Sequence, residues 1–231
     1  MPGPAELEAR FRTFYSGASG KAAEIFERNR NNVLRKLARL LRERKAGGRI
    51  LDLGCGSGYF LAGSFGLANW ERWGSEISEE NAALAEASGI RAVLGDFADA
   101  GFADAFFDAV CVLDTFYYFP APQKTLREIH RILKSGGVLM LELPFAATRL
   151  WRVSSKVNRM DLYYYSPRPV VRLLKEAAFT VERIVPLPAN QQRGLLRNLF
   201  YTVYSFATLA IWNLSFRRLV MAPRFAVIAV K

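Results

Sequence analysis

The chain has 231 residues, of which 51% are hydrophobic and 23% charged, and it carries a formal net charge of +11. This composition is typical of a globular domain and excludes a disordered or collagen-like chain. Cys55 and Cys111 have no neighbouring cysteine or histidine, so we expect no metal site and a reducing compartment. The first residues lack a charged segment followed by an apolar one, so we expect a cytoplasmic rather than a secreted protein.

The charge is unevenly distributed along the chain. Residues 1–49 contain twelve basic and five acidic residues, residues 50–148 six and thirteen, and residues 149–231 fourteen and three. An acidic middle of this kind argues against a uniformly basic nucleic-acid binder. The basic C-terminal part favours an anionic substrate, a nucleic acid or a membrane surface, and a solvated basic face is the alternative.

The expected helices and strands alternate. Residues 22–45 have apolar positions at helical spacing and are followed by Gly47 and Gly48, so they predict a helix. Strands are then expected at 49–53, 71–76, 91–95, 107–113, 137–143, 179–186 and 224–230. Helices are expected between them at 58–68, 79–88, 123–134 and 168–177. Continuous apolar strands that alternate with helices predict a parallel, doubly wound sheet with both faces covered.

A glycine-rich turn follows the first expected strand, in the segment ILDLGCGSGYF at residues 50–60. Ligands of open α/β sheets bind at the carboxyl ends of the strands, and glycines let the backbone approach a ligand closely. Dinucleotide sites have the spacing G-x-G-x-x-G. Here Gly54, Gly56 and Gly58 are spaced G-x-G-x-G and are followed by Tyr59. We therefore expect a ligand other than a dinucleotide.

This segment resembles the first motif of the class I S-adenosylmethionine (SAM)-dependent methyltransferases, and the similarity extends over about residues 45–185. Glu76 in WGSEIS matches the acidic residue that ends the second strand and binds both ribose hydroxyls in this family. The segment GDF at 95–97 matches the part that contacts adenine. FDAVCVLD at 107–114 matches the fourth strand, and EIHRILKSGG at 128–137 resembles the helix-to-strand signature before the fifth.

The resemblance implies an α/β, Rossmann-like, doubly wound sheet of seven strands in the order 3-2-1-4-5-7-6, with the last strand antiparallel. We expect a single domain with an N-terminal helical cap (1–48), a SAM-binding core (49–186), a helical insert (187–222) and the last strand (223–231). The resemblance also implies SAM as cofactor and S-adenosylhomocysteine as product. The cofactor-binding residues it implies are Asp52, Gly54, Cys55, Gly56, Gly58, Glu76, Asp96, Phe97 and Leu113. For Asp52, a structural role in capping backbone N–H groups is the alternative.

The reacting centre of this family lies after the fourth strand, where the chain has DTFYY at residues 114–118. Asp114 and Tyr117 are the candidate catalytic residues, because either could take a proton from a hydroxyl acceptor; the alternative is that they only line the pocket. Amine and nucleic-acid base methyltransferases of the family often carry Asp/Asn-Pro-Pro-aromatic at this place. The absence of prolines here argues against methylation of an exocyclic amine. His130 is expected to be structural.

Residues 187–222 interrupt the alternation, and no charge occurs from Asn198 to Phe216. Leu199, Val203, Phe206 and Leu214 belong to an apolar stripe at helical spacing, so residues 195–221 predict an amphipathic helical cover beside the acceptor site. This helix packs against its own domain or a second subunit in one interpretation. In the other it lies in a membrane interface, at the inner face of the membrane.

These observations predict a SAM-dependent methyltransferase whose acceptor is a small molecule or a lipid-like compound, methylated at oxygen. Two alternatives stay open. The basic C-terminal part favours an RNA methyltransferase, although no RNA-binding module is recognisable and nucleic acid is not the expected partner. A SAM-binding partner protein without catalysis would have the same motifs.

Overall fold

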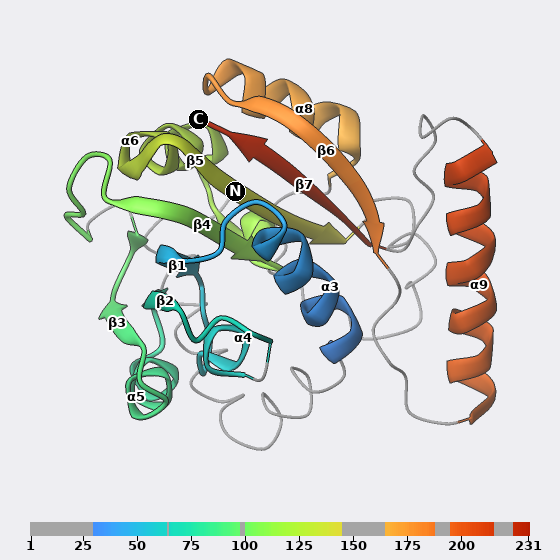
Figure 1. Cartoon of the computed structure of the whole chain (residues 1–231), viewed down its shortest axis with the longest axis horizontal. Coiled ribbons are helices and arrows are strands. Elements are labelled where there is room, and N and C mark those ends of the chain that lie inside the picture. Colours follow the sequence, from blue (N-terminus) through green and yellow to red (C-terminus); the bar gives the residue numbers. More distant parts are fainter. Residues whose placement is uncertain (1–29, 64, 98–99, 145–164, 188–194, 215–223) are drawn as a thin grey trace.

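The computed structural model describes residues 30–63, 65–97, 100–144, 165–187, 195–214 and 224–231. Its strands form one sheet in the order β3-β2-β1-β4-β5-β7-β6 (Figure 1). Neighbouring strands are parallel, except that β7 is antiparallel to both β5 and β6. The predicted strand order and the antiparallel last strand are confirmed. The strands are β1 (Gly48–Leu53), β2 (Trp70–Glu76), β3 (Arg91–Leu94), β4 (Phe107–Leu113), β5 (Leu133–Pro144), β6 (Thr180–Leu187) and β7 (Arg224–Val230).

The strand order reverses between β1 and β4. β1 pairs with β2 on one side and with β4 on the other, and all three run in the same direction. In open α/β sheets the connections diverge at such a point, and the crevice that binds ligands lies at the carboxyl ends of these strands. This is where the glycine turn after β1 and the segment after β4 meet.

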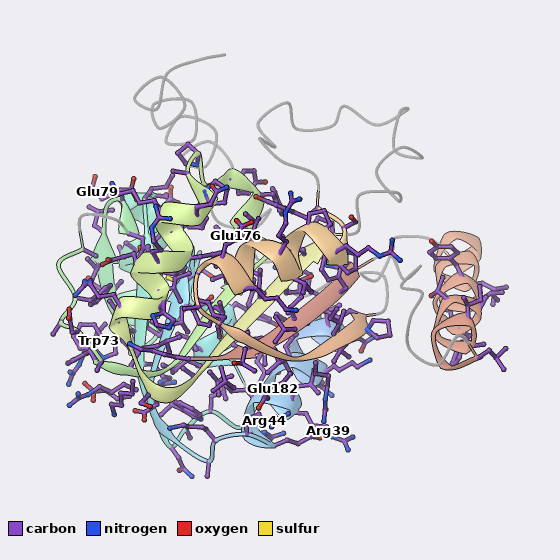
Figure 2. The ribbon with its side chains drawn as sticks, turned by 90° about the horizontal axis from the view of Figure 1, so that it is seen from above. Arg39, Arg44, Trp73, Glu79, Glu176 and Glu182 are labelled. Atoms are coloured by element: carbon purple, nitrogen blue, oxygen red, sulfur yellow. The ribbon has the colours of Figure 1, made fainter. Side chains whose placement is uncertain are left out.

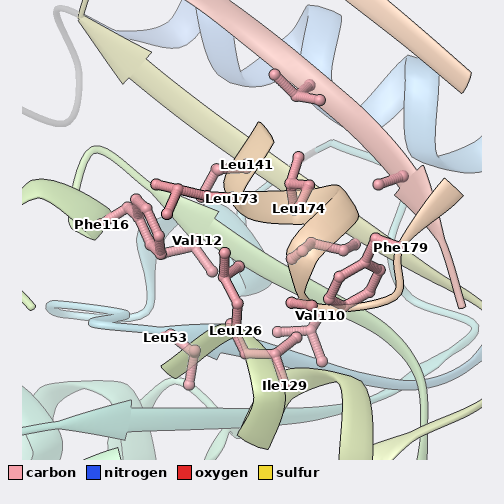
Figure 3. Packing of buried hydrophobic residues seen from close by; sticks show 14 of the residues in the cluster. Leu53, Val110, Val112, Phe116, Leu126, Ile129, Leu141, Leu173, Leu174 and Phe179 are labelled. Atoms are coloured by element: carbon pink, nitrogen blue, oxygen red, sulfur yellow. The ribbon is translucent and has the colours of Figure 1, made fainter. Parts of the chain in front are cut away.

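Helices cover both faces of the sheet (Figure 1). The described helices are α3 (Asn31–Arg42), α4 (Tyr59–Ala62), α5 (Glu79–Ala87), α6 (Pro122–Ile132), α8 (Pro167–Glu176) and α9 (Leu195–Leu214), and the 3-10 turn η2 (Phe116–Tyr118) follows β4. α6 and α8 pack on one face, in a cluster that contains Leu126, Ile129 and Leu174 (Figure 3). α3 and α4 pack on the other, through residues such as Leu37 and Phe60.

The strands supply side chains to both layers in alternation. Val110 and Val112 of β4 belong to the cluster under α6 and α8, whereas Ala109 and Cys111 belong to the cluster under α3. Successive side chains of a strand point to opposite faces, so a strand buried on both sides must be apolar throughout. This explains why the central strands are continuous apolar runs in the sequence.

Two expected helices differ from the structure. The helix expected at 58–68 covers only Tyr59–Ala62, because Gly63 takes an extended conformation directly after it and Gly66 has φ of +77°. The helix expected at 22–45 is observed as α3; residues 22–29 lie outside the described part. No helix in the described part of the chain is long and apolar enough to cross a membrane.

Candidate functional site

The glycine turn after β1 is tied to the neighbouring strand β2 by its backbone. The N–H groups of Gly54 and Cys55 both donate to the carbonyl of Ser75, at 2.8 and 3.1 Å. Gly54, Gly56 and Gly58 have φ of +69°, +57° and +79°, a left-handed conformation that favours glycine. Their spacing thus follows from the backbone path of the turn.

Two of these glycines are also required by packing. A Cβ at Gly54 would collide with Thr115 from the segment after β4, and one at Gly58 would collide with Ile90. The space beside them is filled by protein rather than reserved for a ligand. The sequence argument explained these glycines by the approach of a ligand. The structure shows that they also allow close packing within the protein: Gly54 lets the turn approach the segment after β4, and Gly58 lets it approach Ile90.

Glu76 closes the turn from the end of β2. Its Oε2 accepts the N–H of Gly56 at 2.8 Å, and its Oε1 accepts the N–H groups of Ile77 and Ser78, each at 2.9 Å. A carboxylate has about four acceptor positions, so three backbone bonds leave one for a ligand hydroxyl. Burial raises the pKa of Glu76, and the backbone bonds oppose that effect.

Without a ligand, the burial of the Glu76 carboxylate lowers the stability of the folded protein. The carboxylate is buried and, among the described residues, forms no ion pair with an arginine or lysine. Perturbed carboxylates held in this way at the end of a strand are typical of binding sites. The carboxylate and the preformed turn fit the ribose end of SAM, as the resemblance implies.

The other predicted cofactor residues are placed differently. Asp52 is buried at the end of β1, in register with Gly74 and Cys111 on either side. Asp96 is exposed after β3, whereas Phe97 is buried against Phe102. The side chains of Cys55 and Leu113 are buried in the layer under α3, so only their backbone is available to a ligand in the crevice.

Asn81 is a candidate that the sequence reasoning missed. It lies in the first turn of α5, where its N–H bonds to the capping Ser78, and it is buried. Its Oδ1 accepts no hydrogen bond in the structure. A buried acceptor without a donor lowers the stability of the folded protein by about 1–3 kcal/mol, and a hydrogen bond from a ligand N–H or O–H would offset this cost.

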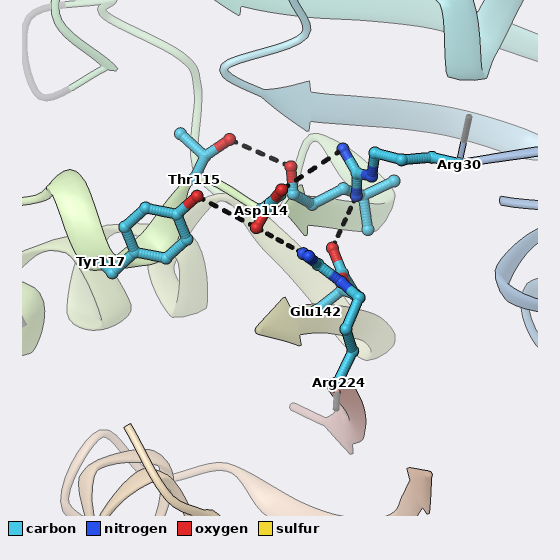
Figure 4. Close-up of polar contacts among 7 residues, drawn as sticks. Arg30, Asp114, Thr115, Tyr117, Glu142 and Arg224 are labelled. Atoms are coloured by element: carbon cyan, nitrogen blue, oxygen red, sulfur yellow. Dashed lines mark hydrogen bonds and ion pairs between the residues drawn. The ribbon is translucent and has the colours of Figure 1, made fainter. Parts of the chain in front are cut away.

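Asp114 lies directly after β4 in a cluster of buried charges (Figure 4). Its carboxylate forms ion pairs with Arg224 and, at 3.9 Å, with Arg30. Both arginines also pair with Glu142, which is fully buried in β5; the Arg30 Nη2 to Glu142 Oε2 distance is 2.7 Å. The four residues are hereafter called the arginine–carboxylate cluster, and their charges sum to zero.

Tyr117 is attached to this cluster. Its hydroxyl donates to Asp114 Oδ1 at 3.0 Å, and its ring lies 4.3 Å from that of Tyr118. Asp114 itself has φ of +63°, an uncommon conformation for a residue with a side chain, and its N–H donates to the carbonyl of Glu142. Such strain is held in place by surrounding contacts and is often found at functional sites.

The cluster decides what the two candidate catalytic residues can do. Burial alone would raise the pKa of Asp114, but the charges of Arg224 and Arg30 lower it overall, so this group stays ionised. Burial and the neighbouring Asp114 charge raise the pKa of Tyr117 well above its ordinary value, so this group stays protonated. Asp114 is therefore a weak base, and Tyr117 holds its proton.

Residues 25–184 match the family described as Methyltransferase domain. The chain belongs to this family. Residues 25–184 are thus a class I SAM-dependent methyltransferase domain, with SAM as its cofactor, as the motifs after β1 and β2 predicted. SAM carries a methyl group on a sulfonium, and the protein supplies orientation and a dry site for its transfer.

Two relatives match only part of the chain. It is 28% identical over 137 residues to "Uncharacterized protein MJ1123" of Methanocaldococcus jannaschii, covering 57% of this chain and 64% of that protein. It is 28% identical over 109 residues to "Probable tRNA methyltransferase 9B" of Bos taurus, covering 46% of this chain and 23% of that protein. The methyltransferase thus spans less than two thirds of either relative.

A solved structure covers nearly the whole chain. It is a chain of the Haloferax volcanii complex formed with the Trm112 methyltransferase activator, with a TM-score of 0.69, 21% identity and coverage of 97% of both chains. At this identity the likeness establishes the fold of the methyltransferase.

The sequence reasoning missed three members of the arginine–carboxylate cluster: Arg30, Glu142 and Arg224. One signal was present, because Glu142 interrupts the apolar run of β5 at residues 138–143. A charge in a strand that is buried on both faces needs a partner. His130 lies away from the cluster, where its ring packs edge-on against Phe179 at 5.1 Å.

Proposed function

We propose that the methyltransferase transfers the methyl group of SAM to a carboxylate oxygen of a small-molecule or lipid-like acid. The observation that carries this proposal is the arginine–carboxylate cluster beside the cofactor turn. Asp114 stays ionised there and Tyr117 stays protonated, so neither is suited to take a proton from an alcohol. A carboxylate arrives without a proton and needs no base.

Transfer of the methyl group to a carboxylate needs no proton donor or acceptor from the protein. The carboxylate oxygen forms a bond to the methyl carbon, the carbon–sulfur bond breaks, and the sulfonium becomes a neutral thioether. No proton is transferred, so positioning and exclusion of water account for the acceleration. In this proposal Asp114 and Tyr117 shape the acceptor end of the site. The basic residues of 1–49 and 149–231 would attract an anionic acceptor.

The experiment is a methyl-transfer assay with SAM labelled in the methyl group and a panel of carboxylic acids of increasing apolar length. We expect label in the organic extract that mild alkali releases as methanol, because an ester hydrolyses whereas an ether or N-methyl group does not. Label that resists alkali would contradict methylation at a carboxylate.

Methylation of RNA is the second candidate, and two observations favour it. A relative is named a tRNA methyltransferase, and the chain has a net charge of +11. The same assay with bulk tRNA tests it, together with the salt dependence of tRNA binding. A steep loss of affinity with salt and label in tRNA would establish this function over the first.

A SAM-binding protein without catalysis is the third candidate. For such a protein, calorimetry would detect binding of SAM, and the assay would show no transfer of the labelled methyl group to acids or tRNA. Because the Haloferax volcanii structure is a complex with an activator, the assay is repeated with that activator added. Turnover that appears only with the activator would support an enzyme that needs a partner.

A further inference from the structure

The helix α9 has two unlike faces. Leu199, Val203, Phe206 and Leu214 are 58%, 59%, 69% and 80% exposed. At 100° per residue they lie within an arc of about 80°, so they form one apolar stripe. Thr208 is 3% exposed and lies on the opposite side of the helix. Among the side chains of α9 that the structure describes, a threonine is thus buried while these four large apolar side chains are exposed.

This arrangement contradicts the interpretation in which the stripe packs against the protein's own domain. An amphipathic helix of a globular protein ordinarily buries its apolar face. Among the described residues, the other large hydrophobic side chains that are exposed are Leu84 and Leu94, on α5 and β3. Single exposed residues of that kind are normal, whereas an exposed stripe indicates an interaction surface.

The charge around α9 indicates what this surface binds. In the sequence, Arg193 precedes α9, Arg197 lies in its first turn, and Arg217 and Arg218 follow its end; no acidic residue occurs from Arg183 to Lys231. α9 has 20 residues, but no helix among the described residues is both long and apolar enough to cross a membrane. An apolar face on a helix whose only charge is Arg197 in its first turn, flanked by further arginines, is typical of helices that lie in the interface of an anionic membrane.

A second copy of the chain fits the stripe less well. Pairing two α9 helices through their stripes would bring together Arg193, Arg197, Arg217 and Arg218 of both copies. Like charges brought together repel, whereas an anionic lipid surface neutralises them.

The position of α9 relates the stripe to the site. In Figures 1 and 2 the helix lies at one side of the sheet, where β5 and β6 end, and it contacts β6. The carboxyl ends of β4 and β5, with the arginine–carboxylate cluster, lie toward that side (Figure 1). A surface bound by α9 would therefore lie near the acceptor end of the site.

We propose that α9 docks the methyltransferase on anionic membranes by inserting Leu199, Val203, Phe206 and Leu214 among the lipid headgroups. This inference goes beyond the proposed function, because it holds whether the acceptor is a carboxylic acid or another compound.

The test is co-sedimentation of the full chain with vesicles of phosphatidylcholine alone and with added phosphatidylglycerol, at low and high salt. We expect binding to the anionic vesicles that weakens with salt. Phe206→Glu should lower the partition coefficient about tenfold or more, as expected from losing the burial of one Phe side chain. Leu84→Glu is the matched control, since it places the same charge on α5, and should bind as the wild type does.

Circular dichroism of both variants shows whether they fold, and neither position is buried. Equal binding of wild type and Phe206→Glu would overturn the proposal. So would wild-type protein that stays in the supernatant, or binds neutral and anionic vesicles alike. A dimer in sedimentation equilibrium that Phe206→Glu dissociates, without vesicle binding, would assign the stripe to a second copy instead.

Discussion

The two ends of the crevice hold their carboxylates in different ways. At the ends of β1 and β2, three backbone N–H groups bind Glu76; two belong to the next residues of the chain, and the third belongs to Gly56, 20 residues before it. At the ends of β4 and β5, two arginine side chains bind Asp114 and Glu142, and they lie 82 and 112 residues from Glu142 in sequence. The cofactor end is thus built by backbone groups, and the acceptor end by long-range ion pairs between side chains.

This difference shows where the methyltransferase can vary. A carboxylate held by backbone N–H groups tolerates changes of the surrounding side chains, so the same cofactor site can persist in distant relatives. A site held by buried ion pairs depends on all of its members, because removal of one leaves an uncompensated charge.

The largest effect is expected when the cluster loses a cation. Arg224→Met leaves Asp114 and Glu142 buried with Arg30 alone, and should lower the free energy of unfolding by about 3–5 kcal/mol. Urea denaturation measures it. Arg39→Met is the control, because Arg39 is 77% exposed and its pair with Glu43 is a surface pair. A loss below about 1 kcal/mol for Arg224→Met would contradict the importance of the cluster.

A smaller effect is expected at the cofactor end. Glu76→Ala should weaken SAM binding by about 1–3 kcal/mol, the cost of losing hydrogen bonds to a charged group. Calorimetry measures it, with Glu71→Ala as control, since Glu71 on the same strand pairs with Arg49 and Arg91 at the surface. Unchanged SAM affinity in Glu76→Ala would remove Glu76 from the site.

The wild type and Glu76→Ala should also differ in how the free energy of unfolding depends on pH. Burial raises the pKa of Glu76, so the folded state favours the protonated form. Its contribution to stability is therefore present at low pH and is lost as pH rises through the folded pKa. We expect the free energy of unfolding of wild type, relative to Glu76→Ala, to fall over that range. Denaturation without SAM at a series of pH values measures it, and a rise would contradict the sign.

Tyr117→Phe removes one hydrogen bond to Asp114 and should cost about 0.5–1.5 kcal/mol of stability. Transfer should slow by less than about tenfold with an unchanged pH profile, because Tyr117 keeps its proton throughout. If the rate fell by about a hundredfold or more and the profile lost a limb, Tyr117 would be a proton acceptor.

The smallest effect is expected for His130→Ala. This residue of α6 packs against Phe179, away from the cluster, and burial together with the nearby Lys231 lowers its pKa. Transfer should stay within about twofold of wild type, as for most substitutions outside a site. A large loss in a folded variant would show that the only histidine takes part in the reaction.

The sequence determined most of the framework around the cofactor turn. The alternation of strands and helices and the turn that Gly54, Gly56 and Gly58 form were predicted from local patterns, whereas the strand order and the antiparallel last strand were predicted from the resemblance to the family. Local reasoning was less reliable for α4, where the apolar spacing extended past Gly63 although the backbone did not.

Only the tertiary structure assembled the other half. Arg30, Asp114, Glu142 and Arg224 are scattered over the chain; the charge of Glu142 within an apolar run indicates that it needs a partner, but not which residues supply it. The pattern of α9 predicted an amphipathic helix, yet it could not tell which face turns outward, because periodicity gives the angle between side chains and not the direction of the core. Burial is decided by what packs beside a helix, and therefore by contacts between segments far apart in sequence.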